Sequence, residues 1–251
     1  MAALDRVSAA GTIYHWGLVN TYRSQLLHGL VRALEVAVVS LFLSIALGMV
    51  LAMWRMAPRR YSWPAAIYIN VFRGVPPLVS VIWVYFGWAL VLNIQLDVFE
   101  ASVVALVLLY SAFLAEIFRA ALTAIPKGQR EAGLSLGFRP RTIFFTVLLP
   151  QAAKISLPNV GSMLIGMVKD TSTFQVIGLM EVVYVSTNAV ASTFQPFVLY
   201  TAAAFIYVVV AFVVDFIFRT LERTIGGRPV GFLPRLLTFR KERRVQAFAE
   251  A

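Results

Sequence analysis

The strongest constraint on the fold of this chain is a set of long apolar stretches without a charged residue. Residues 36–54 read VAVVSLFLSIALGMVLAMW, and residues 74–96 and 196–214 also contain no Asp, Glu, Lys or Arg. A helix needs about 20 mostly apolar residues to cross the hydrocarbon core of a bilayer. Because 60% of the residues are hydrophobic and only 14% are charged, soluble globular and disordered proteins are excluded. The sequence predicts an all-α membrane protein.

Hydropathy predicts five transmembrane helices, at residues 34–54, 68–96, 101–124, 160–179 and 196–218. The second contains Pro76 and Pro77, which are expected to kink it. The fourth is polar near its middle, where Lys169 and Asp170 follow an apolar run. An odd number of crossings places the two ends of the chain on opposite sides of the membrane.

The positions of the basic residues predict the orientation. Of the 22 Lys and Arg residues, 16 lie after the first span, between the third and fourth spans, and after the fifth. The loops around residues 97–100 and 182–195 contain none. Because Lys and Arg accumulate in cytoplasmic loops, the N-terminus is expected outside and the C-terminus in the cytoplasm. The basic excess then reflects topology and contact with membrane lipid, and no nucleic-acid partner is expected.

The chain is therefore divided into three parts. Residues 1–33 are expected to form an N-terminal periplasmic or interfacial segment, and residues 34–225 the transmembrane domain. Residues 226–251 are expected to form a basic cytoplasmic tail that is attracted to anionic lipid.

The loop at about 126–150, PKGQREAGLSLGFRPRTIFFTVLLP, is unlike an ordinary membrane connector. A short helix is expected over residues 131–136, followed by a sharp turn at Gly137, which has no Cβ. A second helix is expected over residues 142–149 and is closed by Pro150, which lacks a backbone N–H. Such an exposed cytoplasmic knob suits docking into a groove on a partner protein; the alternative is a merely amphipathic surface segment.

The same loop carries a recognisable motif. Glu131, Ala132 and Gly133 are followed after three residues by Gly137, and after nine more by VLLP at residues 147–150. This chain resembles the permease subunits of ABC importers for polar amino acids, whose loop reads EAA, three residues, G, nine residues, IxLP. It departs at Gly133, where the family has Ala, and at the first residue of VLLP, where the family has Ile. Further matching segments are FRGVPPL (72–78), AEIFRAAL (115–122), IPKGQREA (125–132), LPQA (149–152) and KDTS (169–172).

The resemblance covers residues 29–225 and implies a type I (MetI-like) ABC importer permease in the bacterial cytoplasmic (inner) membrane. It implies a second, identical or related permease chain, two ATPase subunits and a periplasmic or lipid-anchored solute-binding protein. The chain lacks the GxxxxGK[ST] phosphate loop, so it is expected to be a transport subunit without catalytic or metal-binding residues. No cofactor is expected on this chain, because ATP and Mg would bind the partner. The residues that would couple it to the ATPase are Arg130, Glu131, Ala132, Gly133, Gly137, Phe138 and Arg139.

Charges inside the predicted spans are candidates for contact with the solute, because an ionisable group in hydrocarbon needs a partner or a wet cavity. Glu116 and Arg119 are three residues apart on one helix face and could neutralise each other. Lys169 and Asp170 are adjacent and point in different directions. We expect Glu116 and Asp170 to face the ammonium of a zwitterionic amino acid, with Lys169 and Arg119 near its carboxylate and Thr173 adding a hydroxyl. The alternative is a salt-bridge network that locks helices together and never touches solute.

Other charged residues receive structural expectations. Arg73 is expected to anchor the second span at the cytoplasmic edge, and Glu35 and Asp215 to lie near helix ends. Two other classes of function stay open: a secondary transporter or channel that works alone, and a membrane-embedded enzyme. The enzyme is disfavoured because the chain has no Cys and its two His residues, His15 and His28, lie near the N-terminus.

Overall fold

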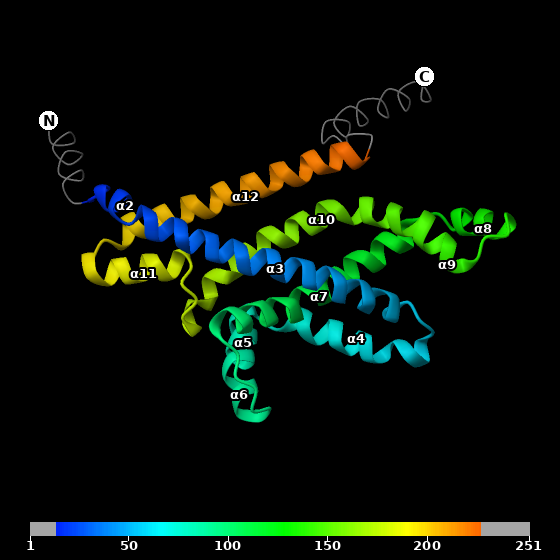
Figure 1. Cartoon of the computed structure of the whole chain (residues 1–251), viewed down its shortest axis with the longest axis horizontal. Coiled ribbons are helices and arrows are strands. Elements are labelled where there is room, and N and C mark those ends of the chain that lie inside the picture. Colours follow the sequence, from blue (N-terminus) through cyan, green and yellow to red (C-terminus); the bar gives the residue numbers. More distant parts are fainter. Residues whose placement is uncertain (1–13, 227–251) are drawn as a thin grey trace, which may run out of the picture.

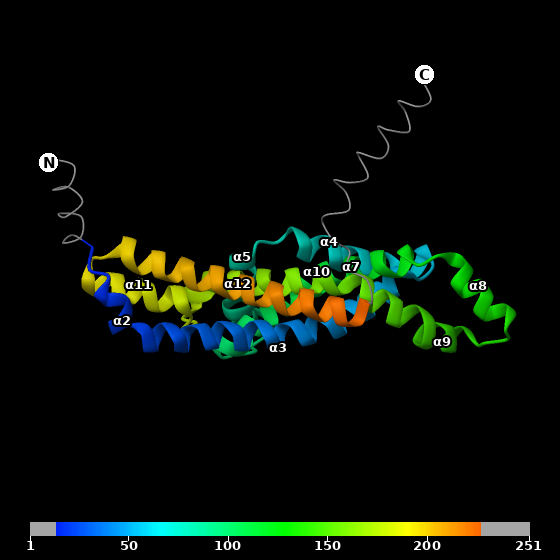
Figure 2. The same cartoon turned by 90° about the horizontal axis from the view of Figure 1, so that it is seen from above.

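The computed structural model describes residues 14–226, and every element in this range is a helix. The long helices run along the longest axis of the molecule in both views (Figures 1 and 2). Within the described residues, four stretches are long and apolar enough to cross a membrane, and a bent pair of helices adds a fifth if the pair is counted as one span. The prediction of an all-α membrane protein is thereby confirmed. The basic tail, residues 227–251, and residues 1–13 lie outside the described range. The four stretches are Arg23–Arg55 (α3), Val98–Ala124 (α7), Pro140–Ile177 and Pro196–Thr224.

Helix α3 packs closely on α7 at the centre of the molecule. At Gly48 an added Cβ would lie 3.0 Å from the Leu114 Cβ and 3.1 Å from the Ser111 carbonyl oxygen, both on α7. Ser40 and Ser44 on the same helix are also fully buried. Small residues allow helix backbones to approach each other in a membrane. Helix α3 begins at Arg23 rather than at residue 34.

The expected single span over residues 68–96 is instead a broken pair. Helix α4 (Arg59–Gly74) meets the next helical stretch at 109°. Val75 and Pro76 both have extended backbone, with ψ of 129° and 145°, because each precedes a proline, which disfavours helical ψ. The second half projects away from the long helices (Figure 1). It consists of α5 (Pro77–Ile82), the π-helical turn Trp83–Gly87 and α6 (Trp88–Val91).

The expectation that Pro150 closes a helix is wrong. Helix α9 (Pro140–Ile143) continues through a π-helical turn at Phe144–Leu148 into α10 (Leu149–Asp170), and Pro150 lies in the first turn of α10. Pro150 has no backbone N–H to donate, and the π-helical turn directly before α10 accommodates this break in the hydrogen-bond ladder. The fourth span therefore begins well before residue 160.

The two ends of the molecule differ in structure. One end carries α2 (Gly17–Thr21) and α11 (Val182–Thr193), and the other carries α8 (Lys127–Ser135) and α9 (Figure 1). We call them the α11 end and the α8 end. Between α10 and α11 lies a 3-10 helix, Thr171–Ile177, and α12 (Pro196–Gly226) returns along the bundle.

Candidate functional site

Two adjoining cavities lie between α7, α10 and the break that follows α4. The first has a volume of about 370 Å³ and includes Tyr110 and Asp170 in its lining. The second has a volume of about 640 Å³ and includes Glu116. Arg73 and Met163 line both cavities. The walls are mostly apolar, and the charged groups among them are one guanidinium and two carboxylates.

Asp170, the last residue of α10, is held by a hydroxyl from α7. The Tyr110 hydroxyl donates to Asp170 Oδ2 at 2.8 Å. One helical turn earlier, an added Cβ at Gly166 would lie 2.7 Å from the Tyr110 oxygen. Residues four apart share a helix face, so Gly166 leaves the space through which Tyr110 reaches Asp170. Sequence reasoning missed Tyr110, because a contact across 60 positions leaves no local pattern.

Glu116 on α7 pairs with Arg119, as the spacing of three residues predicted. The Arg119 guanidinium donates to Glu116 Oε2 from Nε at 3.0 Å and from Nη2 at 2.7 Å. Glu116 lines the second cavity, whereas Arg119 lines neither. Of the two paired residues, only Glu116 is in a cavity lining and therefore accessible to a solute there.

Arg73 was expected at the cytoplasmic edge, and the structure corrects this. Its guanidinium carbon lies 5.6 Å from the centre of the Phe113 ring, between the two cavities. Because α4 begins at Arg59 and not at residue 68, Arg73 lies about 20 Å along the helix from its start, at 1.5 Å per residue. The sequence did contain a signal for this position. Arg73 lies three residues before the Pro76–Pro77 pair, which breaks the helix, and broken helices line cavities in transporters.

The remaining predicted site residues do not line these cavities. Lys169 is exposed. The Thr173 hydroxyl donates to the backbone oxygen of Asp170 at 2.8 Å, within the 3-10 turn. The structure thus brings Arg73, Glu116 and Asp170 together, and solute contact by the predicted residues stays a prediction.

The loop at the α8 end has the turn that its sequence predicts. Gly137 has a φ of +78°, which suits glycine. The Phe138 N–H donates to the Gly133 oxygen at 3.0 Å and the Gly137 N–H to the Leu134 oxygen at 2.9 Å, a Schellman motif. Gly133 is buried, and an added Cβ would lie 2.8 Å from Ile143 Cγ1. The departure from the EAA pattern therefore makes room for Ile143.

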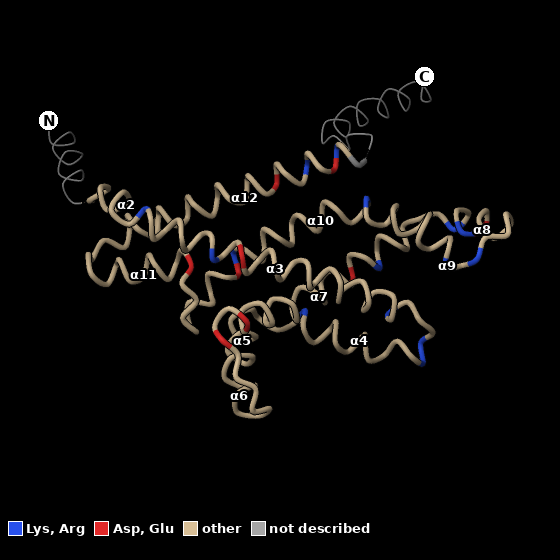
Figure 3. The backbone as a smooth tube through the Cα atoms, in the orientation of Figure 1, with Lys and Arg blue, Asp and Glu red and all other residues tan. Residues whose placement is uncertain are grey.

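The outer face of this loop is available to a partner. Leu136 and Phe138 are 74% and 49% exposed, and Lys and Arg residues gather around α8 and α9 (Figure 3). The other residues predicted to couple the loop to an ATPase, except the buried Gly133, are also exposed: Arg130, Glu131, Ala132, Gly137 and Arg139. Within residues 14–226, no group of three or more His, Asp or Glu side chains could hold a metal ion.

Several curated proteins are similar to this chain. The arginine transport system permease protein ArtQ of Bacillus subtilis (strain 168) is 37% identical over 199 residues, covering 79% of this chain and 91% of the relative. The glutamine transport system permease protein GlnP of Escherichia coli (strain K12) is 38% identical over 160 residues, covering 63% and 73%. The L-cystine transport system permease protein TcyB of Bacillus subtilis (strain 168) is 31% identical over 216 residues, covering 85% and 92%.

Solved structures share the fold. A crystal structure of an amino acid ABC transporter with histidines matches with a TM-score of 0.77 and 29% identity, covering 84% of this chain and 98% of the other. The MetNI methionine ABC transporter in an inward-facing conformation matches with a TM-score of 0.72 and 20% identity, covering 82% and 98%. The expected type I (MetI-like) permease fold is confirmed.

A family model described as "Binding-protein-dependent transport system inner membrane component" matches residues 44–227. With the apolar spans, this match confirms the predicted inner-membrane location of a multi-pass protein. It also confirms the resemblance found in the sequence. The chain belongs to the family of binding-protein-dependent transport system inner membrane components.

Proposed function

We propose that this chain is the permease subunit of an ATP-driven importer of polar amino acids. The observation that carries the proposal is the charge pattern of the two cavities, which hold the Arg73 guanidinium and the Glu116 and Asp170 carboxylates. A zwitterionic amino acid has the complementary charges, an ammonium and a carboxylate. The names of the relatives support the substrate class, because they transport arginine, glutamine and cystine.

In the proposed arrangement the solute's carboxylate meets Arg73, since a guanidinium can donate two parallel hydrogen bonds to a carboxylate. The solute's ammonium meets Asp170 or Glu116, which accept from it. In this proposal Arg73 takes the role near the solute's carboxylate that the sequence predicted for Lys169 and Arg119. Each charged end of the solute then exchanges its contacts with water for contacts with a group of opposite charge. This exchange lowers the free-energy cost of moving the solute through an apolar environment.

The α8 end is proposed to be cytoplasmic, because Lys and Arg gather there, and the α11 end faces outward. The exposed apolar side chains of Leu136 and Phe138 would seat the loop in a groove of an ATPase subunit. Two such subunits, a second permease chain and a solute-binding protein complete the importer. ATP binding and hydrolysis by the partners would alternate access to the cavities.

The test is uptake of amino acids by proteoliposomes that contain the whole importer, with Asp170→Asn, Glu116→Gln and Arg73→Gln compared one at a time. Each variant is expected to raise KM for uptake about tenfold or more, the effect of one charged hydrogen bond, while the complex still assembles. Glu35→Gln is the matched control, because Glu35 pairs with Arg32 at 2.9 Å and lines neither cavity. Unchanged uptake and substrate preference in the three cavity variants would show that the site assignment is wrong. Full concentrative uptake without an ATPase would instead favour a stand-alone transporter.

A further inference from the structure

A third cavity, of about 220 Å³, lies between α10 and α12 toward the α8 end. Its lining includes the charged side chains of Asp215, Arg219 and Glu222. Arg219 Nε donates to Asp215 Oδ2 at 2.6 Å. Glu222 is half-buried and makes no hydrogen bond or ion pair with another described residue. This cleft therefore holds two carboxylates and one guanidinium, and one carboxylate is unpaired within residues 14–226.

Beside the cleft, α10 and α12 approach each other closely at Gly161. The Phe218 side chain of α12 lies against Gly161 of α10, where an added Cβ would be 2.6 Å from the ring carbon Cγ. Ser162 adds a hydroxyl to the lining, and that hydroxyl donates to the Pro158 oxygen at 3.2 Å. A cleft with polar and charged side chains thus lies in the seam between the two helices.

The cleft lies where the hydrocarbon core ends. The uncharged stretch 196–214 is about 28 Å long at 1.5 Å per residue, close to the thickness of about 30 Å of a bilayer core. Asp215 is the residue that follows. The cleft is therefore at the depth of lipid headgroups in the leaflet on the α8 side, which is the cytoplasmic leaflet in the orientation proposed above.

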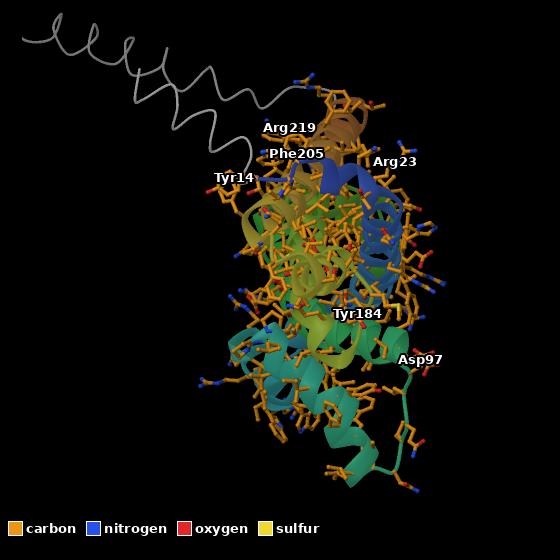
Figure 4. All side chains as sticks on the ribbon, turned by 90° about the vertical axis from the view of Figure 1, so that its left-hand side faces the viewer. Tyr14, Arg23, Asp97, Tyr184, Phe205 and Arg219 are labelled. Atoms are coloured by element: carbon orange, nitrogen blue, oxygen red, sulfur yellow. The ribbon has the colours of Figure 1, made fainter. Side chains whose placement is uncertain are left out.

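The neighbouring face of α12 is apolar and exposed. Phe212 and Phe216 are 71% and 70% exposed, and Phe205 is 68% exposed. Viewed along the bundle from the α11 end, Phe205 and Arg219 both lie at the edge of the molecule that α12 forms (Figure 4). A molecule with an apolar tail against these rings could place its polar head in the cleft.

We propose that this cleft binds the headgroup of a phospholipid that carries a primary ammonium and a phosphate, the phosphatidylethanolamine class. The Arg219 guanidinium binds the phosphate, and the Asp215 and Glu222 carboxylates accept N–H bonds from the ammonium. A choline headgroup has no N–H to donate, so it loses those bonds. A purely anionic headgroup is disfavoured because the cleft has a net negative charge.

The experiment is native mass spectrometry on the full complex from nanodiscs with equal amounts of phosphatidylethanolamine and phosphatidylcholine of the same acyl chains. The wild-type complex is expected to retain the ethanolamine lipid about tenfold over the choline lipid, the ratio for one charged hydrogen bond. Glu222→Gln is expected to return the ratio to that of the bulk lipid. Glu35→Gln is the control, because it removes the same charge from a side chain that is 45% exposed and that does not line the cleft.

Glu222→Gln breaks no hydrogen bond or ion pair between described residues, so loss of folding is not expected to obscure the result. Equal retention of the two lipids by wild type, or an unchanged preference in Glu222→Gln, would overturn the proposal. Preferential retention of phosphatidylglycerol in a mixture of all three lipids would also overturn it. Deleting residues 227–251 is expected to leave the preference unchanged, and a rise in retained lipid would instead identify that segment as the occupant. None of these readouts requires transport, so they are independent of the proposed function.

Discussion

Replacing Tyr207 by Phe removes a hydroxyl that bonds a fully buried carboxylate. Glu181 is 0% exposed and accepts from the Val183 and Tyr184 N–H groups at 2.8 and 2.7 Å, where it caps α11. The Tyr207 hydroxyl on α12 donates to the same carboxylate at 2.6 Å. The substitution keeps the cap and the ring and removes the hydrogen bond that ties α11 to α12.

The expected cost follows from the charge of the acceptor. A hydrogen bond to a charged group contributes about 1.5–3 kcal/mol, and about 2 kcal/mol corresponds to a factor of about 30 in the opening equilibrium of α11. The contact with α3 stays, since an added Cβ at Gly29 would lie 2.8 Å from the Glu181 carbonyl carbon. The variant is therefore expected to fold while α11 opens more often.

The assay uses the absence of native cysteine. Ser186 on α11 is fully buried, so Ser186→Cys reports opening of that helix by its rate of maleimide labelling. Tyr207→Phe is expected to raise this rate about 30-fold. Tyr68→Phe is the control, because it removes a Tyr hydroxyl that bonds neutral partners elsewhere, the Leu108 oxygen at 3.1 Å and Ser111 at 2.9 Å, between α4 and α7. A rate within about twofold of wild type, or an equal rise with Tyr68→Phe, would refute the reasoning.

Three further predictions concern single positions. Gly166→Ala is expected to displace the Tyr110 hydroxyl, which lies 2.7 Å from the added Cβ, and to lower uptake about tenfold. Gly17→Ala is the control, because an added Cβ there has no atom within 4 Å, and equal uptake by the two variants would contradict the prediction. Gly137→Val, at a φ of +78°, is expected to abolish ATP-driven uptake while the complex assembles, and unimpaired uptake would count against the loop's coupling role. Burial raises the pKa of the Glu181 carboxyl above its ordinary 4.5, so the folded state holds this proton more tightly than the unfolded state does. The Glu181 contribution to stability is expected to fall as pH rises from about 4.5 through the raised pKa, and Glu181→Gln, followed by thermal unfolding between pH 4 and 8, should flatten that dependence.

Local chemistry determined what could be predicted. The turn at Gly137 and the pairing of Glu116 with Arg119 depend on residues within a few positions of each other, and both predictions are confirmed. Apolar runs identified the spans for the same reason, because hydropathy is summed along the chain. Helix α11 was missed because a Glu caps it, and the standard start signals are Ser, Thr, Asp and Asn.

Depth in the membrane was harder to predict than span identity. Arg73 was assigned to the membrane edge because hydropathy placed the start of its span at residue 68, whereas α4 begins at Arg59. The charged residues after α3 lower the hydropathy of the first turns of α4, so hydropathy did not include those turns in the span. The partner of Asp170 could not be predicted either, because Tyr110 lies within an apolar run and contacts Asp170 only when α7 and α10 pack together.

The continuity of α10 with α9 gives the coupling proposal a physical basis. One helical stretch, Pro140–Ile177, begins beside Gly133, where Ile143 packs, and carries Met163 and Asp170 in the cavity linings. From Pro150 to Asp170 this stretch extends about 30 Å at 1.5 Å per residue. A displacement of α8 by a nucleotide-driven partner would therefore move Asp170 through a single helix, without a flexible linker between them. Within this helical stretch, the π-helical turn at Phe144–Leu148 is where bending is expected to be easiest, because its hydrogen-bond ladder already departs from that of an α-helix.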